Sequence, residues 1–125
     1  MLDEGVPVSV GHVFESLGQE VIFYRDVLPE SVPDHVVAVA ALTNNAILVA
    51  IDEDMRRIAR KYGQKGQDPR YAKLNLIHLC CDSVLASKRA DHAFSFIEFE
   101  WNFNIKKPAR RMWIEIGAHY LKTHR

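Results

Sequence analysis

Cysteine is nearly absent from this chain, and so are basic residues in its first 54 positions. The two cysteines, Cys80 and Cys81, are adjacent, so they can neither close a long loop nor supply a zinc-ligand spacing. We interpret them as reduced thiols in or near the core of a cytoplasmic protein. No apolar run approaches the about 20 residues that cross a bilayer, and the acidic start at Asp3 and Glu4 lacks the basic region of a signal peptide. Disulfide scaffolds and membrane-spanning proteins are therefore not expected.

The shortage of early bases divides the charge along the chain. Residues 1 to 54 contain ten acids against Arg25 alone, a net charge of −9, while the whole chain is neutral. Such asymmetry fits an acidic, metal-binding pocket beside a basic surface for a polyanion, although solvated helix faces also produce such patterns. A length of 125 residues and a hydrophobic content of 48% suit a single domain spanning residues 1–125.

The most informative stretch is the apolar run from Ala46 to Ile51, which ends in the acids Asp52, Glu53 and Asp54. An uninterrupted run of this kind predicts a strand buried on both faces, central in a mainly parallel sheet. Asp52 then lies at the carboxyl end of that strand, where ligands of open α/β sheets gather. The alternative is that Asp52 only caps the following helix, with the next two acids in its first turn.

Helix and strand patterns alternate along the remaining chain. We predict a three-layer α/β sandwich with a mainly parallel sheet and a C-terminal β-hairpin. Residues 83–107 alternate partly like a strand but are too long for one, so we predict a helix. The predicted strands are residues 1–2, 20–24, 46–51 and 74–80; the predicted helices are residues 8–17, 35–42, 53–62 and 83–107. Three local predictions accompany them: a capping box over residues 31–34, a loop over residues 64–70 and a type II′ turn at Gly117 and Ala118.

This order places several acids near one edge of the sheet. Asp3 follows the first strand, Asp34 opens the helix that leads into the third strand, and Asp52 follows that strand. Carboxylates crowded together repel one another, and a hard divalent cation such as Mg²⁺ or Mn²⁺ relieves the repulsion. The sequence therefore predicts a metal site at the carboxyl edge.

Three motifs resemble the acidic motifs of PIN-like domains, in particular a short bacterial group related to VapC-type toxins. They are Leu2-Asp3-Glu4, the helix start at residues 33–37, and residues 47–55. The resemblance covers residues 1 to 80 and implies a metal-dependent ribonuclease with Mg²⁺ or Mn²⁺ as its cofactor. It also implies that the protein acts as a toxin and has an antitoxin partner. It implies that Asp3, Asp34 and Asp52 are catalytic and bind the metal, with Asp54 as an accessory ligand. The chain departs from the family at Ala50-Ile51, where Thr-Arg is usual, and at Gly5, where Asn is common.

A basic stretch follows the acids. Between positions 56 and 73 there are seven bases against Asp68, with Tyr62 and Tyr71 among them. Such clusters bind phosphate backbones, and tyrosines stack on unpaired bases. RNA is the expected partner, contacted by Arg56, Arg57, Arg60 and Lys61, although a solvated helix face would show the same pattern.

Other residues admit simpler interpretations. His78 lies within a predicted strand and is expected to be a satisfied core or edge residue rather than a ligand, and no histidine pair has zinc spacing. Aromatic residues between positions 94 and 105 are expected in the core, or partly on the surface of a homodimer.

Two other function classes stay open. Asp3, Glu4 and Asp52, with Lys106 and Lys107, also resemble the acidic pocket and lysine of phosphoacceptor receiver domains. The third possibility is a PIN-like module that binds RNA or protein without catalysis.

Overall fold

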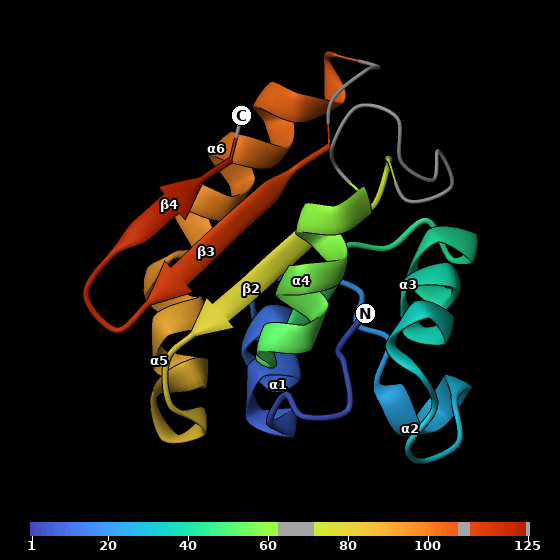
Figure 1. The fold of residues 1–125 in the computed structure, drawn as a ribbon. Helices are drawn as coiled ribbons and strands as arrows, with labels where there is room; N and C mark the ends of the chain where they lie inside the picture. Colours follow the sequence, from blue (N-terminus) through green and yellow to red (C-terminus); the bar gives the residue numbers. More distant parts are fainter. Residues whose placement is uncertain (63–71, 108–110, 125) are drawn as a thin grey trace.

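The computed structural model describes residues 1–62, 72–107 and 111–124. The predicted loop over residues 64–70 lies outside this part of the chain. Helices and a four-stranded sheet make a mixed α/β arrangement (Figure 1). The elements in chain order are α1 (Val8–Ser16), α2 (Tyr24–Val27), α3 (Asp34–Thr43), β1 (Leu48–Ala50), α4 (Glu53–Tyr62), β2 (Leu76–Cys80), α5 (Ser83–His92), α6 (Phe94–Ile105), β3 (Trp113–Gly117) and β4 (Leu121–Thr123).

The sheet is mainly parallel, as predicted. Its order is β1-β2-β3-β4; the first two pairings are parallel and the β3–β4 pairing is antiparallel. β1 is buried as its sequence predicts, but it ends this four-stranded order, so the prediction of a central strand was wrong. Its outer edge is covered by residues 1–3, where Leu2 forms a parallel bridge with Val49. That extra pairing explains how a terminal strand can be fully apolar.

Alternate residues of the strands enter two separate apolar clusters. Val49, Ile77 and Ile114 pack with residues of α1, α5 and α6. Leu48, Leu76 and Trp113 pack with residues of α3 and α4. Because neighbouring strand residues point to opposite faces of a sheet, both faces of the strands contribute to a core.

The segment over residues 20–24 is not the strand that its β-branched and aromatic residues predict. It makes one backbone hydrogen bond to the N-terminal segment, from Leu2 N to Ile22 O at 2.9 Å, and the chain then enters α2 at Tyr24. Tyr24 is buried against the α3 cluster. The run is apolar because its side chains pack on both cores, and no continuous ladder forms along it.

Helix α1 ends as predicted, with Gly18 in the left-handed region at φ 83°. Gly11 within the same helix allows the segment after it to pack closely. A Cβ atom at Gly11 would collide with Cε1 of Phe23. The helix and the extended segment can therefore approach only if this position has no side chain.

Replacing Gly11 with alanine is expected to lower the free energy of unfolding by about 1 to 3 kcal/mol, the usual range for overpacking a well-filled site. Urea denaturation measures this loss. Ser9→Ala, on the exposed side of α1, is the matched control and should change stability little. Equal stability of the two variants would contradict the close packing of α1 on Phe23.

Helix α3 lies close to its predicted bounds, but its N-terminus is not capped in the predicted way. The predicted capping box is wrong, since Pro33 is the N-cap and no side chain caps the helix. Ser31 instead adopts φ 57°, and its N–H donates to the carboxylate of Glu4 at 3.2 Å. This bond ties the loop before α3 to the N-terminal segment.

The long segment after β2 is helical, as predicted, although it forms two helices that meet at Ala93. Ile97 of α6 is buried, whereas Phe99 and Ile105 are 62% and 56% exposed. The terminal hairpin is also confirmed by the antiparallel β3–β4 pairing. The type II′ turn is not, because Gly117 lacks positive φ and ends β3 itself. Within the described residues, no helix has the length and apolar character needed to cross a membrane.

Candidate functional site

Asp3 is held at the carboxyl end of β1 by backbone pairing. Its N–H donates to Val49 O at 2.8 Å, and its side chain is buried. One carboxylate oxygen, Oδ1, accepts the N–H of Glu4 at 2.8 Å. The short N-terminal pairing segment therefore fixes this carboxylate beside the start of α4.

Asp34 reaches the same region through a different contact. Glu4, next to Asp3, accepts the Ser31 N–H, and Asp34 follows three residues later at the first position of α3. Its side chain is partly buried. The bond between Glu4 and Ser31 thus brings a helix start towards the edge of the sheet.

Asp52 and Asp54 complete the acidic cluster, which consists of Asp3, Asp34, Asp52 and Asp54. Asp52 follows β1 directly, and Asp54 lies in the first turn of α4. Gly5 lies close by, because a Cβ atom there would be 3.2 Å from Oδ2 of Asp52. A side chain at position 5 would therefore enter the space beside Asp52.

The acidic side chains lie within one another's electric field. Burial raises the pKa of Asp3, and the charges of Asp34, Asp52 and Glu4 raise it further, against the lowering by the Glu4 N–H bond. Burial also raises the pKa of Asp34, aided by the charges of Asp54 and Asp52 and opposed by His35. Mutual repulsion of this kind is the electrostatic condition that a bound divalent cation relieves.

The basic residues predicted to bind RNA lie in different environments. Arg56 turns towards the sheet, where its Nε lies 2.7 Å from Oε1 of the buried Glu115. Arg57 is 78% exposed and lies 3.5 Å from Asp54, and Arg60 is also exposed. The side chain of Lys61 lies outside the described part of the structure. Arg57 and Arg60 are thus the surface bases that the structure describes on α4.

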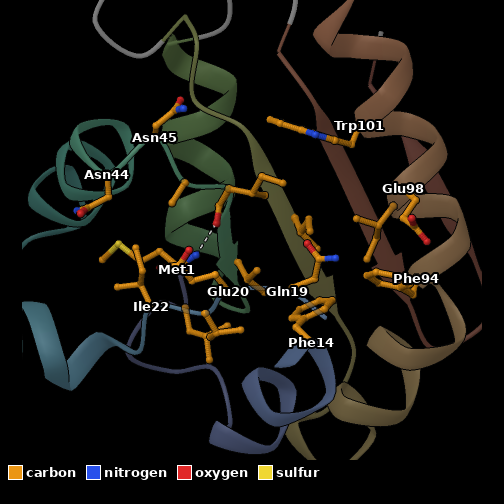
Figure 2. A pocket seen from close by; sticks show the side chains of 17 residues that line it. Met1, Phe14, Gln19, Glu20, Ile22, Asn44, Asn45, Phe94, Glu98 and Trp101 are labelled. Atoms are coloured by element: carbon orange, nitrogen blue, oxygen red, sulfur yellow. Dashed lines mark hydrogen bonds between the residues drawn. The ribbon is translucent and has the colours of Figure 1, made fainter. Parts of the chain in front are cut away.

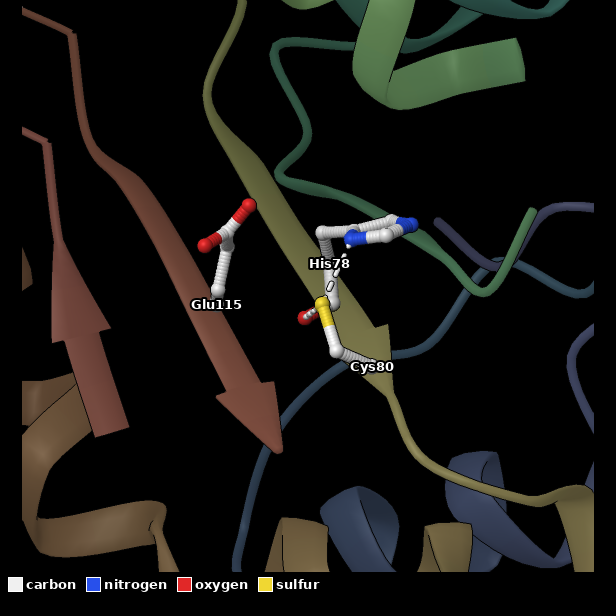
Figure 3. Close-up of side chains that lie close together, drawn as sticks. All are labelled: His78, Cys80 and Glu115. Atoms are coloured by element: carbon white, nitrogen blue, oxygen red, sulfur yellow. Dashed lines mark hydrogen bonds between the residues drawn. The ribbon is translucent and has the colours of Figure 1, made fainter. Parts of the chain in front are cut away.

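A second polar group, which the sequence analysis missed, lies on the face of the sheet towards α4. His78 and Cys80 come from β2 and Glu115 from β3, and Figure 3 shows the three side chains close together. Their potential ligand atoms all lie within 4.8 Å of one another. Among the described residues, this is the one group of three or more such side chains that is close enough to hold an ion, and the four acids of the acidic cluster do not form such a group.

This triad could have been suspected from the sequence. His78 and Cys80 are two apart in an otherwise apolar strand, so they share one face. Glu115 interrupts the equally apolar β3, and it is the register partner of His78. His78 is buried, which confirms the prediction of a core residue, and its ring nitrogens contact Cys80 Sγ and the backbone oxygen of Asp52.

An apolar hollow of about 410 Å³ lies near the amino ends of β1 and β2. Figure 2 shows Phe14, Phe94 and Trp101 around it, with Glu20 and Glu98 also among its lining residues. It belongs to the cluster formed with α1 and α6 and shares no residue with the acidic cluster.

Compared with known protein families, with curated proteins and with solved structures, the chain matches none. Its function must therefore be argued from the residues themselves.

Proposed function

We propose that this protein is a metal-dependent ribonuclease of PIN-like type that acts as the toxin of a toxin–antitoxin pair. The observation that supports the chemistry is the approach of Asp3, Asp34 and Asp52, from three separate segments, with Asp54 behind them. Beyond the effect of burial, the charges of Asp34 and Asp52 raise the pKa of Asp3, and those of Asp54 and Asp52 raise the pKa of Asp34. The proposal that the protein cleaves RNA and acts as a toxin rests on the resemblance of residues 1–80 to PIN-like domains.

The donor set fits a hard cation. Carboxylate oxygens are the ligands of Mg²⁺ and Mn²⁺, and the cluster offers four such groups, of which Asp3 is buried and Asp34 partly buried. When bound, the cation supplies an activated water and neutralises charge on the phosphodiester. Asp3, Asp34 and Asp52 would hold it, while Asp54 keeps the site acidic from the first turn of α4.

The fold is compatible with this proposal. A PIN-like domain requires a three-layer sandwich, and the two apolar clusters on opposite strand faces support that arrangement. A receiver-like domain would need a lysine near the acids. Lys107 instead lies with its Nζ 4.5 Å from the ring centroid of Phe103. Figure 1 places the end of α6 near the start of β3, away from the start of α4.

A binding module without catalysis is the second candidate. Two observations favour this module. Among the described residues the acids do not form a group close enough to hold an ion, and Ala50-Ile51 replaces the Thr-Arg that is common in PIN-like domains. Ala50 is buried and carries no hydroxyl that could contact a substrate. Cleavage separates the two candidates, because both bind RNA in this account.

The test is cleavage of single-stranded RNA by the purified chain with Mn²⁺, compared with Asp52→Asn. The proposal expects Mn²⁺-dependent cleavage by the wild type alone, and growth arrest on its expression. RNA binding with no cleavage of any of a panel of structured and unstructured RNAs would favour the binding module.

RNA binding itself should depend on exposed bases of α4. Charge reversal at Arg57 and Arg60 is expected to weaken binding to all sequences alike and to flatten its salt dependence. On single strands each phosphate contact contributes a slope of about −0.7 to the plot of log affinity against log salt. Fluorescence anisotropy at several salt concentrations measures both effects, with Arg25→Glu on α2 as the control. Unchanged affinity in the double variant would assign these bases to a solvated helix face.

We further propose that α6 contributes to a homodimer, because Phe99 and Ile105 are large, apolar and exposed. Replacing Phe99 with glutamate is expected to convert a dimer to a monomer in light scattering, since a charge cannot be buried there without a partner. Glu98→Gln, at an exposed neighbouring position, is the control. A wild-type chain that is monomeric at all concentrations would contradict the proposal.

A further inference from the structure

The triad of His78, Cys80 and Glu115 is assembled by the register of two neighbouring strands. His78 pairs with Glu115 and Cys80 pairs with Gly117 across the β2–β3 ladder. Side chains two apart on one strand, and opposite each other on adjacent strands, point to the same face. Figure 3 shows that they do so here, with a hydrogen-bonded contact between His78 and Cys80. The three ligand atoms are therefore positioned by the sheet rather than by a loop.

The tautomer of His78 is set by its surroundings. Nε2 lies 3.1 Å from the backbone oxygen of Asp52, which can only accept, so Nε2 carries the hydrogen. Nδ1 is then the unprotonated nitrogen, and it lies 2.9 Å from Sγ of Cys80, whose thiol can donate to it. Metal-binding histidines characteristically donate their other ring N–H to a carbonyl or carboxylate in this way.

Burial keeps the imidazole neutral. It lowers the pKa of His78, an effect that the Asp52 bond and the charges of Glu53 and Glu115 only partly offset. A neutral ring is the form that binds a metal. His78 thus presents a ligand atom, with its partner nitrogen already satisfied.

Glu115 supplies a carboxylate oxygen that lacks a hydrogen bond. Oε2 lies 3.3 Å from Nε2 of His124. Oε1 lies 2.7 Å from Nε of Arg56, but the two atoms are not aligned as a hydrogen bond. Among the described residues, neither Oε1 nor Nε of Arg56 has a hydrogen-bond partner. Glu115 is 1% exposed. Oε1 is thus a buried acceptor that is paired by charge with Arg56 but has no aligned hydrogen-bond donor.

Charge around the triad favours an ionised Glu115. Burial would raise the pKa of Glu115, but the nearby His124 and the charges of Arg56 and Lys122 outweigh it and lower the pKa. Cys80 differs, since burial raises its pKa and the Tyr120 bond only partly opposes this. The thiol therefore carries a proton at neutral pH, and a cation that binds sulfur must release that proton to solvent.

We propose that His78 Nδ1, Cys80 Sγ and a Glu115 oxygen form a binding site for Zn²⁺ or a similar borderline transition-metal ion. The mixed nitrogen, sulfur and oxygen set excludes Mg²⁺ and Ca²⁺ as preferred occupants, because those ions select oxygen alone. Three protein ligands leave one tetrahedral position open to water. Arg56 and His124 lie 2.7 and 3.3 Å from the two oxygens of the carboxylate and fix its orientation. The site is distinct from the acidic cluster, since Asp52 contributes only its backbone oxygen, to a ring nitrogen.

Titration with Co²⁺ as a spectroscopic substitute for Zn²⁺ tests the site. The expected result is a sulfur-to-cobalt charge-transfer band that saturates at one thiolate-bound ion per chain and that Zn²⁺ abolishes by competition. Cys80→Ser should remove the band and weaken Zn²⁺ binding by more than about 100-fold, beyond the loss typical of outer-shell changes. Cys81→Ser, at the adjacent thiol, is the matched control and should retain both.

His78→Gln and Asp52→Asn sharpen the test. The first should weaken Zn²⁺ binding as Cys80→Ser does, with folding checked by circular dichroism. The second should leave Zn²⁺ binding unchanged, so this proposal and the Mn²⁺ site can fail separately. A folded wild type that shows no charge-transfer band, or a band removed by Cys81→Ser and kept by Cys80→Ser, would overturn the assignment.

Discussion

Replacing Asp52 with asparagine is expected to abolish Mn²⁺-dependent RNA cleavage, with a loss of more than about 100-fold, since even outer-shell partners of a metal cost 10- to 100-fold. The charge of Asp52 acts on both Asp3 and Asp34. Asparagine keeps the shape but removes the anionic ligand. Initial rates of cleavage at saturating Mn²⁺ measure the effect.

The same variant should not lose stability without metal. Asp3 and Asp34 have raised pKa values in the folded protein, so the folded state holds protons more tightly than the unfolded one. Their contribution to stability is present at low pH and is lost as pH rises through the folded pKa values. At neutral pH the cluster therefore opposes folding, and removing Asp52 should leave the melting temperature equal or higher. That gain should vanish as pH falls below about 3.8, the ordinary aspartate value.

The exposed Asp26 of α2 provides the control. Asp26→Asn should leave both cleavage and the pH dependence of melting unchanged. If Asp52 only caps α4, Asp52→Asn should instead cost about 0.5 to 2 kcal/mol and show no connection with metal. Retention of full activity by Asp52→Asn would remove it from the catalytic set.

Replacing Arg56 with methionine is expected to lower the free energy of unfolding by about 2 to 3 kcal/mol, towards the low end for breaking a buried ion pair. The variant leaves the buried carboxylate of Glu115 with His124 as its remaining close partner. Methionine preserves much of the apolar stem, so lost packing contributes little. Urea denaturation measures the change.

Arg57→Met is the matched control, one residue further along α4. Its partner Asp54 is 70% exposed, and such pairs contribute about 1 kcal/mol or less. Adding Glu115→Gln to Arg56→Met should recover part of the loss, because the uncompensated charge is removed. Equal stability of Arg56→Met and Arg57→Met would show that Arg56 does not stabilise the sheet.

Local patterns predicted the helices well. The apolar spacing of α1, the acids that open α4 and the left-handed Gly18 are all encoded within a few residues. Strands were harder to predict from the sequence, because a strand forms only where a neighbouring segment pairs with it through backbone hydrogen bonds. Residues 20–24 have strand-like composition but obtain a single backbone bond, from Leu2 N to Ile22 O. β1 ends the four-stranded order for a related reason, because its outer partner is too short to count as a strand.

The candidate sites show the same limit. The acids could be predicted because each lies at the end of an element, and element ends of a parallel sheet meet at one edge. The pairing of His78 with Glu115 depends on the β2–β3 register, which joins residues far apart in sequence. Arg56 was assigned to RNA for the same reason, since nothing local shows that it reaches Glu115.

Melting curves with and without millimolar Mn²⁺ test the central claim most directly. They are best recorded on Cys80→Ser, which keeps the acidic cluster and removes the sulfur ligand of the second site. The account predicts a higher melting temperature with Mn²⁺, equivalent to about 2.7 kcal/mol when the ion is 100-fold above its Kd, and no such rise when Asp52→Asn is added. A melting temperature that Mn²⁺ leaves unchanged would contradict it.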